Sequence, residues 1–231
     1  MITKKDFGWS GPPKPEDLKS VEEYERPIKE GTVWDFIRTD NIHEFTKFVV
    51  LFNVKMSEES TEINGWEFRI TDLSAFIGSL RVLKYMIING VEIDENAIEW
   101  SIIGGEEQMI GFLSEQNHSF DHKLNTAIIN HRNKICYWLM ENYEWENPEI
   151  LPQCVRCFNT EMFLFFIEQK RDINEKDDFE LTSLMCAAFR NNIPIAKLIL
   201  SIDDVDIEAK DEVGKTANDF AKTTEIRGFR I

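Results

Sequence analysis

The 231-residue sequence predicts an all-α solenoid of about six stacked helix pairs, with two short hairpin fingers near the C-terminus. Apolar residues recur at helical spacing along most of the chain. This pattern repeats at intervals of 26 to 38 residues. An amphipathic helix pair cannot bury its apolar face alone, so successive pairs have to stack on one another.

The most complete repeat lies in residues 182–221. It opens with T-S-L-M-C-A-A, continues with an apolar segment at residues 195–200, and ends in a second G-K-T-A start. This order resembles an ankyrin repeat followed by the opening of the next one, where the family has T-P-L-H-x-A-A and I-V-x-L-L. Ser183 and Met185 replace the family's Pro and His, which predicts a weaker hydrogen-bonded helix start.

The same pattern recurs around the position that the family fills with Gly between its two helices. Counted from that position, the repeats follow one another at intervals of 38, 27, 26, 27, 33 and 34 residues. The positions are Asp40, Gly78, Gly105, His131, Phe158, Asn191 and Glu225. The short middle repeats lack the residues of a projecting finger, and they resemble divergent ankyrin arrays of large protist families.

Residues 1–31 match no repeat and are expected to form an N-terminal arm. Gly and Pro break regular structure up to about Glu16, so the arm is expected to be partly disordered. Residues 17–26 are compatible with a short polar helix that caps the first repeat. The repeat array is then expected over residues 32–231.

Within the array, the first helix pair is expected at residues 32–52, with a turn at Asp40. An insert at about residues 56–69 follows this pair and carries Asn64-Gly65, a strong turn signal. Beside this turn, Trp66 is either an anchor folded back on the array or an exposed contact.

After the short middle repeats, the last two intervals regain the family's full length, so the two real fingers are expected at residues 174–181 and 208–215. Phe179 and Val213 lie near their tips. From about residue 216 the chain should form a truncated C-terminal cap with a polar outer face, as the end of a repeat array requires.

The sequence shows no P-loop, G-x-G-x-x-G, G-x-S-x-G or H-E-x-x-H motif, so we expect no enzyme activity and no cofactor. Cys154 and Cys157 form a C-x-x-C, but no second ligand pair accompanies it, so no metal site is predicted. The alternative is an enzyme in which Cys157 or Cys186 is the nucleophile and His131 or His122 is the base.

The resemblance instead implies a non-catalytic scaffold or adaptor that binds a protein or peptide. Ankyrin arrays bind partners through the outward positions of the first helices, which form a concave face, and through the fingers. The corresponding residues here are Leu73, Phe76, Ile77, Trp100, Ile103, Ile129, Arg156, Phe179, Phe189, Arg190 and Val213. An exposed apolar stripe would mark a contact surface with Phe76 and Trp100 as anchors. Alternatively, the N-terminal arm covers the stripe, or the divergent repeats rotate it into the core.

The formal net charge is −16. Such a field repels nucleic acid and anionic membrane and accelerates encounter with basic proteins. The negative charge is interpreted either as an ordinary solubilising surface or as a match to a partner with a basic surface. No apolar run is long enough for a membrane span, and the N-terminus lacks a signal peptide. A cytoplasmic location is therefore expected, whereas the oligomeric state does not follow from the sequence.

Overall fold

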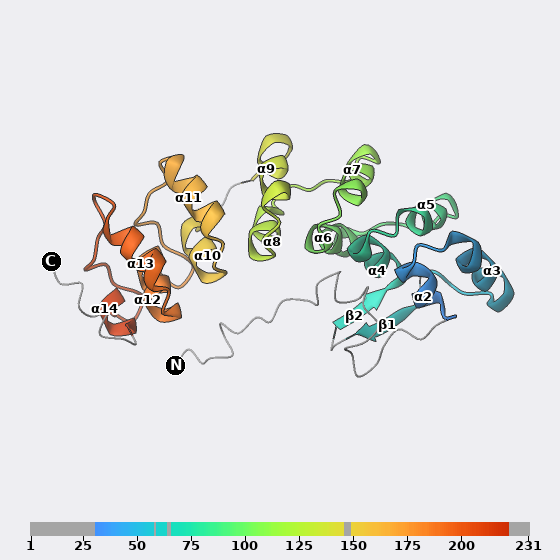
Figure 1. The fold of residues 1–231 in the computed structure, drawn as a ribbon, viewed down its shortest axis with the longest axis horizontal. Helices are drawn as coiled ribbons and strands as arrows, with labels where there is room; N and C mark the ends of the chain where they lie inside the picture. The colour runs from blue at the N-terminus through green and yellow to red at the C-terminus, as the bar shows by residue number, and fades with distance from the viewer. Residues whose placement is uncertain (1–30, 58, 64–65, 146–148, 222–231) are drawn as a thin grey trace. The chain divides into compact units, whose positions relative to one another are not determined.

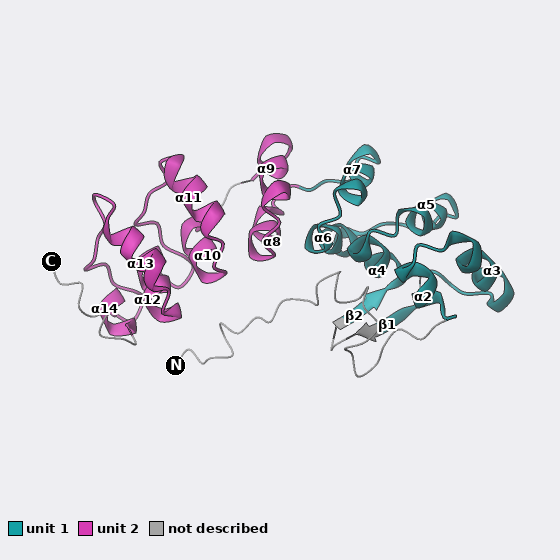
Figure 2. Ribbon diagram, in the orientation of Figure 1, with its two compact units in different colours: residues 1–120 teal, residues 121–231 magenta. Residues whose placement is uncertain are grey.

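A computed structural model describes residues 31–57, 59–63, 66–145 and 149–221 (Figure 1). This part of the chain consists of helix pairs and one small β-hairpin, which confirms the predicted helical solenoid. The chain divides into two compact units, residues 1–120, called unit 1, and residues 121–231, called unit 2 (Figure 2). No described helix is long and apolar enough to cross a membrane.

Unit 1 contains three helix pairs in its described residues. Its elements are α2 (Val33–Arg38), α3 (Ile42–Phe52), β1 (Ser60–Ile63), β2 (Trp66–Arg69), α4 (Ile70–Ile77), α5 (Leu80–Ile88), α6 (Glu95–Gly104) and α7 (Glu107–Glu115). The first helices of the pairs pack in the order α2, α4, α6, and α3 packs against α5.

Unit 2 contains three further pairs and a short last helix within the described range. Its elements are α8 (Leu124–Ile129), α9 (Asn133–Asn142), α10 (Ile150–Arg156), α11 (Thr160–Glu168), α12 (Ser183–Arg190), α13 (Ile193–Leu200) and α14 (Ala217–Phe220). Here α8, α10, α12 and α14 pack in sequence order as first helices. The predicted polar cap beyond α14 lies outside the described residues.

The repeat register is visible in the backbone. Each described residue at the predicted position between two helices has a positive φ, from 47° to 82°. These residues are Asp40, Gly78, Gly105, His131, Phe158 and Asn191. A left-handed residue ends a helix and reverses the chain, as the helix pair requires. The seventh position, Glu225, lies outside the described residues.

Close backbone packing fixes the middle of unit 1. Every residue of α4 is buried, because α2, α6 and β2 all contact it. At the end of α6, Gly104 lies directly against the main chain of α4. A Cβ at this position would be 2.0 Å from the carbonyl oxygen of Phe76. Only glycine allows the two helices to approach this closely.

The sequence missed the β-hairpin. Strands β1 and β2 are antiparallel, from the pair Ser60–Arg69 at the open end to Ile63–Trp66 at the turn. The predicted insert is therefore a third hairpin, placed directly before a first helix as a finger is. The Asn64-Gly65 turn and the side chain of Trp66 lie outside the described residues.

The two predicted fingers are present in unit 2. The first is closed by an antiparallel bridge between Lys176 and Thr182. In the second, the backbone N–H of Asp211 donates to the carbonyl oxygen of Lys215 over 2.9 Å. Each finger ends at the start of a first helix, α12 or α14. The predicted N-terminal arm lies outside the described residues up to position 30.

Candidate functional site

In unit 1, the expected exposed stripe is buried. Leu73 and Phe76 are 0% exposed and Ile77 is 4% exposed. The expectation that these side chains face solvent is therefore wrong. The strand β2 contributes to this burial at Phe76, because the ring of Phe68 lies 5.5 Å from that of Phe76, centroid to centroid. Phe68 is itself 0% exposed.

Further along this face, α6 contributes to the same aromatic cluster. The ring of Trp100 lies 4.5 Å from Phe68 and 5.5 Å from Phe76, again between centroids. Trp100 is half-buried, while Ile103 is buried at 9% exposure. The two predicted anchors thus hold the hairpin on the helices, and neither is a freely exposed contact.

Ion pairs fix the base of the hairpin. Arg69 precedes α4, and its guanidinium donates to Asp72 over 2.8 Å and to Asp94, the N-cap of α6, over 2.7 Å. The hydrogen bonds with Asp94 and then Asp72 raise the pKa of Arg69, and the bond from Arg69 lowers the pKa of Asp94. One arginine therefore joins the hairpin to two successive first helices.

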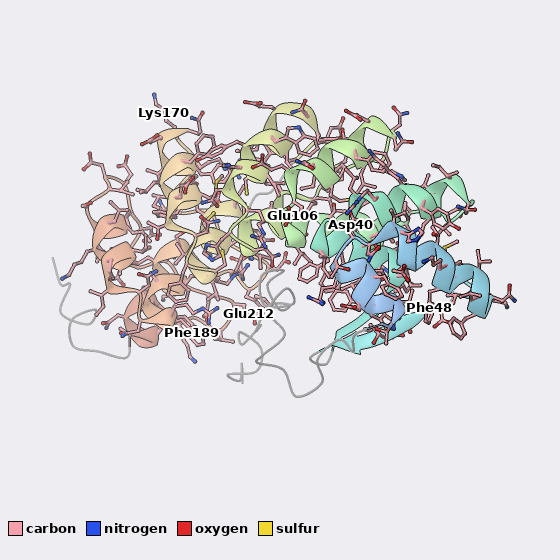
Figure 3. The ribbon with its side chains drawn as sticks, turned by 45° about the vertical axis from the view of Figure 1, so that its right-hand side comes forward. Asp40, Phe48, Glu106, Lys170, Phe189 and Glu212 are labelled. Atoms are coloured by element: carbon pink, nitrogen blue, oxygen red, sulfur yellow. The ribbon has the colours of Figure 1, made fainter. Side chains whose placement is uncertain are left out.

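In unit 2, the predicted positions remain partly exposed. Ile129, Arg156, Phe189 and Arg190 are all half-buried, on α8, α10 and α12. The Nε of Arg190 donates to the carbonyl oxygen of Arg156 over 3.0 Å. Phe189, labelled in Figure 3, meets Phe220 of α14 edge to face at 6.2 Å. These contacts orient the side chains without covering them.

A buried carboxylate holds the first finger. Asp177 accepts hydrogen bonds from the backbone N–H groups of Phe179 and Leu181 over 2.9 and 2.8 Å. Its other oxygen pairs with Arg156 over 2.6 Å, and its side chain is fully buried. Charge-assisted bonds of this kind are the stronger ones. The turn is therefore fixed while Phe179 at its tip stays 45% exposed.

The second finger repeats this arrangement. Asp211 accepts from the backbone N–H groups of Val213 and Lys215 over 3.0 and 2.7 Å. Val213 at the tip is 68% exposed. Asp177 and Asp211 occupy the same position in successive repeats, 34 residues apart. The sequence places both aspartates at the predicted tips, but their role in holding the turns was not predicted, although an Asp two residues before a tip is a recognisable turn signal.

Two further acidic residues link the first finger to the start of α10. Glu175 accepts from the backbone N–H of Leu151 over 2.6 Å, and burial raises the pKa of Glu175. Burial and then a hydrogen bond with Asp178 raise the pKa of Glu149, the N-cap residue of α10. The finger is thus held at several points along its length.

The geometry gives little support to the alternative in which the protein is an enzyme with a cysteine nucleophile. Burial raises the pKa of all four thiols, to about 12 for Cys136 and Cys186. The Nε2 of His131 lies 2.8 Å from the carbonyl oxygen of Cys157, so the ring contacts the backbone instead of the thiol. A nucleophilic cysteine needs a lowered pKa. Across the described residues, no group of three His, Cys, Asp or Glu is placed to hold a metal ion.

Comparison with known proteins gives a family match and several structural matches. Residues 88–166 match the family described as "Domain of unknown function (DUF3447)". No curated protein matches the chain.

The structural similarities extend over most of the chain. The human ASB11 ankyrin repeat domain has a TM-score of 0.62 at 13% identity, covering 84% of this chain and 94% of that one. The ankyrin repeat domain of Bcl-3, of the IkappaB protein family, has a TM-score of 0.55 at 12% identity, with coverages of 84% and 95%.

A third similar chain comes from the complex of the Bdellovibrio bacteriovorus predatory endopeptidase Bd0816 with the immunity protein Bd3460. Its TM-score is 0.55 at 16% identity, and the match covers 69% of this chain and 97% of that one. With the left-handed residues at the repeat positions, these similarities show that the chain has the fold of a divergent ankyrin-repeat protein.

Proposed function

We propose that the chain is a protein-interaction module that binds its partner in unit 2, through the two finger tips and the adjoining face of α10 and α12. The observation that carries this proposal is the pair of fixed turns with exposed apolar tips. Phe179 and Val213 lie 45% and 68% exposed on loops that buried carboxylates hold in place. Apolar side chains on a preorganised loop lose little entropy on binding.

The neighbouring residues fit a contact surface. Phe189, Arg156 and Arg190 are half-buried, so each has area left for a partner. Aromatic residues and arginine are the types that most often dominate binding energy. Leu73, Phe76 and Ile77 do not enter this proposal, because they are buried.

The charge of the protein favours a basic partner. The tips carry Asp178 and Glu212 directly beside Phe179 and Val213, and the chain as a whole has a formal net charge of −16. Exposed charges of this kind accelerate association with a basic surface, and salt screens them. The association rate should therefore fall as ionic strength rises.

The proposal is tested by photo-crosslinking in extracts of the source cell. A crosslinking amino acid is placed at Phe179, at Val213 or, as the matched control, at Leu164, a 41% exposed residue on α11. We expect one protein to crosslink at both finger positions and not at the control. The combined Phe179→Ala and Val213→Ala change should then abolish its capture. Equal crosslinking at all three positions, or capture that survives the double change, would contradict the proposed surface.

A further inference from the structure

An apolar surface lies at the C-terminal end of α3. Val50, Leu51 and Phe52 are 73%, 75% and 67% exposed, and we refer to these three residues as the α3 end. The ring of Phe52 packs against that of Phe48, one helical turn earlier, at 4.6 Å between centroids. Phe48 is labelled in Figure 3. Three adjacent large apolar side chains at such exposure usually indicate a contact surface.

The α3 end belongs to the first repeat, and this position makes its exposure unusual. In a stacked array, an outer surface that no neighbouring repeat covers has to be polar for solubility. Here α2 and α3 pack against α4 and α5 on one side. The aromatic series from Phe36 through Phe48 to Phe52 runs outward to the exposed α3 end. Apolar surface of this kind usually marks a place where another segment packs.

We propose that residues 17–26 of the same chain form an amphipathic helix that docks on the α3 end and caps the first repeat. The first argument is the place where the chain enters the first helix pair, at the start of α2. Because the turn at Asp40 reverses the chain, the start of α2 and the end of α3 lie at the same end of the pair. α3 has 11 residues and α2 has six, so the last turn of α3 extends beyond the start of α2.

The tether is long enough for this docking. Tyr24 is seven residues before Gly31, which corresponds to at most about 25 Å of extended chain. A short tether also produces an effective concentration in the mM range. A segment of the same chain therefore has an advantage over a second copy at the micromolar concentrations of ordinary solution experiments.

The second argument is the sequence of the segment. Residues 17–26 read DLKSVEEYER, with Leu18, Val21 and Tyr24 at successive intervals of three. Residues three apart lie on the same side of a helix, and charged residues fill most of the remaining positions. A helix of this composition is stable only when its apolar side packs against another surface. The exposed apolar side chains of the α3 end offer such a surface.

Hydrogen exchange of the full-length protein tests the proposal. We expect backbone amides of residues 17–26 to exchange at least about tenfold more slowly than unstructured amides, as docked segments do. The combined Leu51→Ser and Phe52→Ser change should remove this protection. The matched control Leu164→Ser, at an exposed apolar position on α11, should leave it intact. Circular dichroism and the exchange of α4 amides confirm that each variant is folded.

Three results would overturn the proposal. Unprotected exchange of residues 17–26 in the unchanged protein would show that this segment does not dock. Protection that persists in the double serine variant would place the segment on another surface. A molar mass that falls from dimer to monomer in the same variant would show that a second copy covers the α3 end. None of these results depends on partner binding at the fingers in unit 2.

Discussion

Gly104 allows α4 and α6 to pack with their main chains in contact, and Gly104→Ala tests that packing directly. An alanine Cβ would lie 2.0 Å from the carbonyl oxygen of Phe76 and 2.8 Å from its carbonyl carbon. Because both obstructing atoms belong to the backbone of a buried helix, no side-chain rotation relieves the overlap. The helices would have to separate by about 1 Å, which weakens every contact along their shared face.

The free-energy cost follows from this displacement. Overpacking a core usually costs about 1–3 kcal/mol, and an overlap with backbone lies at the upper end of that range. The higher helix propensity of alanine offsets this destabilisation by about 1 kcal/mol at most. We therefore expect Gly104→Ala to reduce the free energy of unfolding by about 2 kcal/mol or more.

Gly111 in α7 provides the matched control. It is also a helical glycine, but a Cβ there meets nothing within 4 Å. Gly111→Ala should therefore stabilise the protein by about 0.5–1 kcal/mol, through helix propensity alone. Urea denaturation followed by circular dichroism measures both variants. A Gly104→Ala variant as stable as Gly111→Ala would refute the close approach of α4 and α6.

Three further predictions concern unit 2 and the thiols. In urea denaturation, Asp177→Ala should lower the free energy of unfolding by about 3–5 kcal/mol, because it leaves Arg156 without its buried partner. Asp211→Ala should lower it by only about 1–2 kcal/mol, because that change removes hydrogen bonds to the backbone of the turn. Leu139→Ala, at a position 1% exposed, should cost about 2–5 kcal/mol, and an unchanged denaturation midpoint would contradict the register of that repeat. Burial raises the pKa of Cys186 from 9.0 to about 12, so the folded state holds this proton more tightly. The contribution of this thiol to the free energy of unfolding should be complete below pH 9 and fall by up to about 1.4 kcal/mol per pH unit above it, so Cys186→Ala should reduce the alkaline slope by that amount.

The sequence predicted the repeat register well because the register depends on local pattern. His131 and Phe158 lack glycine's tolerance of a positive φ, yet the apolar spacing on both sides identified them as turn residues, and both have φ values in the left-handed region. Such residues cost about 1 kcal/mol of strain, which the surrounding helix packing has to offset. The pattern on both sides of the turn was therefore more informative than the residue at the turn.

Exposure was harder to predict, because it depends on segments outside the repeat pattern. Leu73 and Phe76 occupy positions that face a partner in the family, but here both are buried, and Phe68 of the hairpin packs against Phe76. Residues 66–69 read W-E-F-R, an alternation typical of a strand, although four residues are too few to establish one from sequence alone. No repeat template specifies where such an insert packs.

The hairpin and the two fingers occupy the same position in their repeats, directly before a first helix, but their apolar side chains differ in exposure. Each precedes a first helix, and each is held by a carboxylate. Asp72 accepts from Arg69 at the base of the hairpin in unit 1, whereas Asp177 and Asp211 accept from backbone N–H groups of their own turns in unit 2. In the hairpin the apolar side chain points at the helices and is buried, whereas in the fingers the tips remain exposed. Burial of Phe68 stabilises unit 1 by about 1.5–3 kcal/mol, a gain that exposed tips forgo. A protein keeps such exposed apolar tips on fixed loops at a cost in stability, and this cost is the physical reason to look for its partner at the fingers.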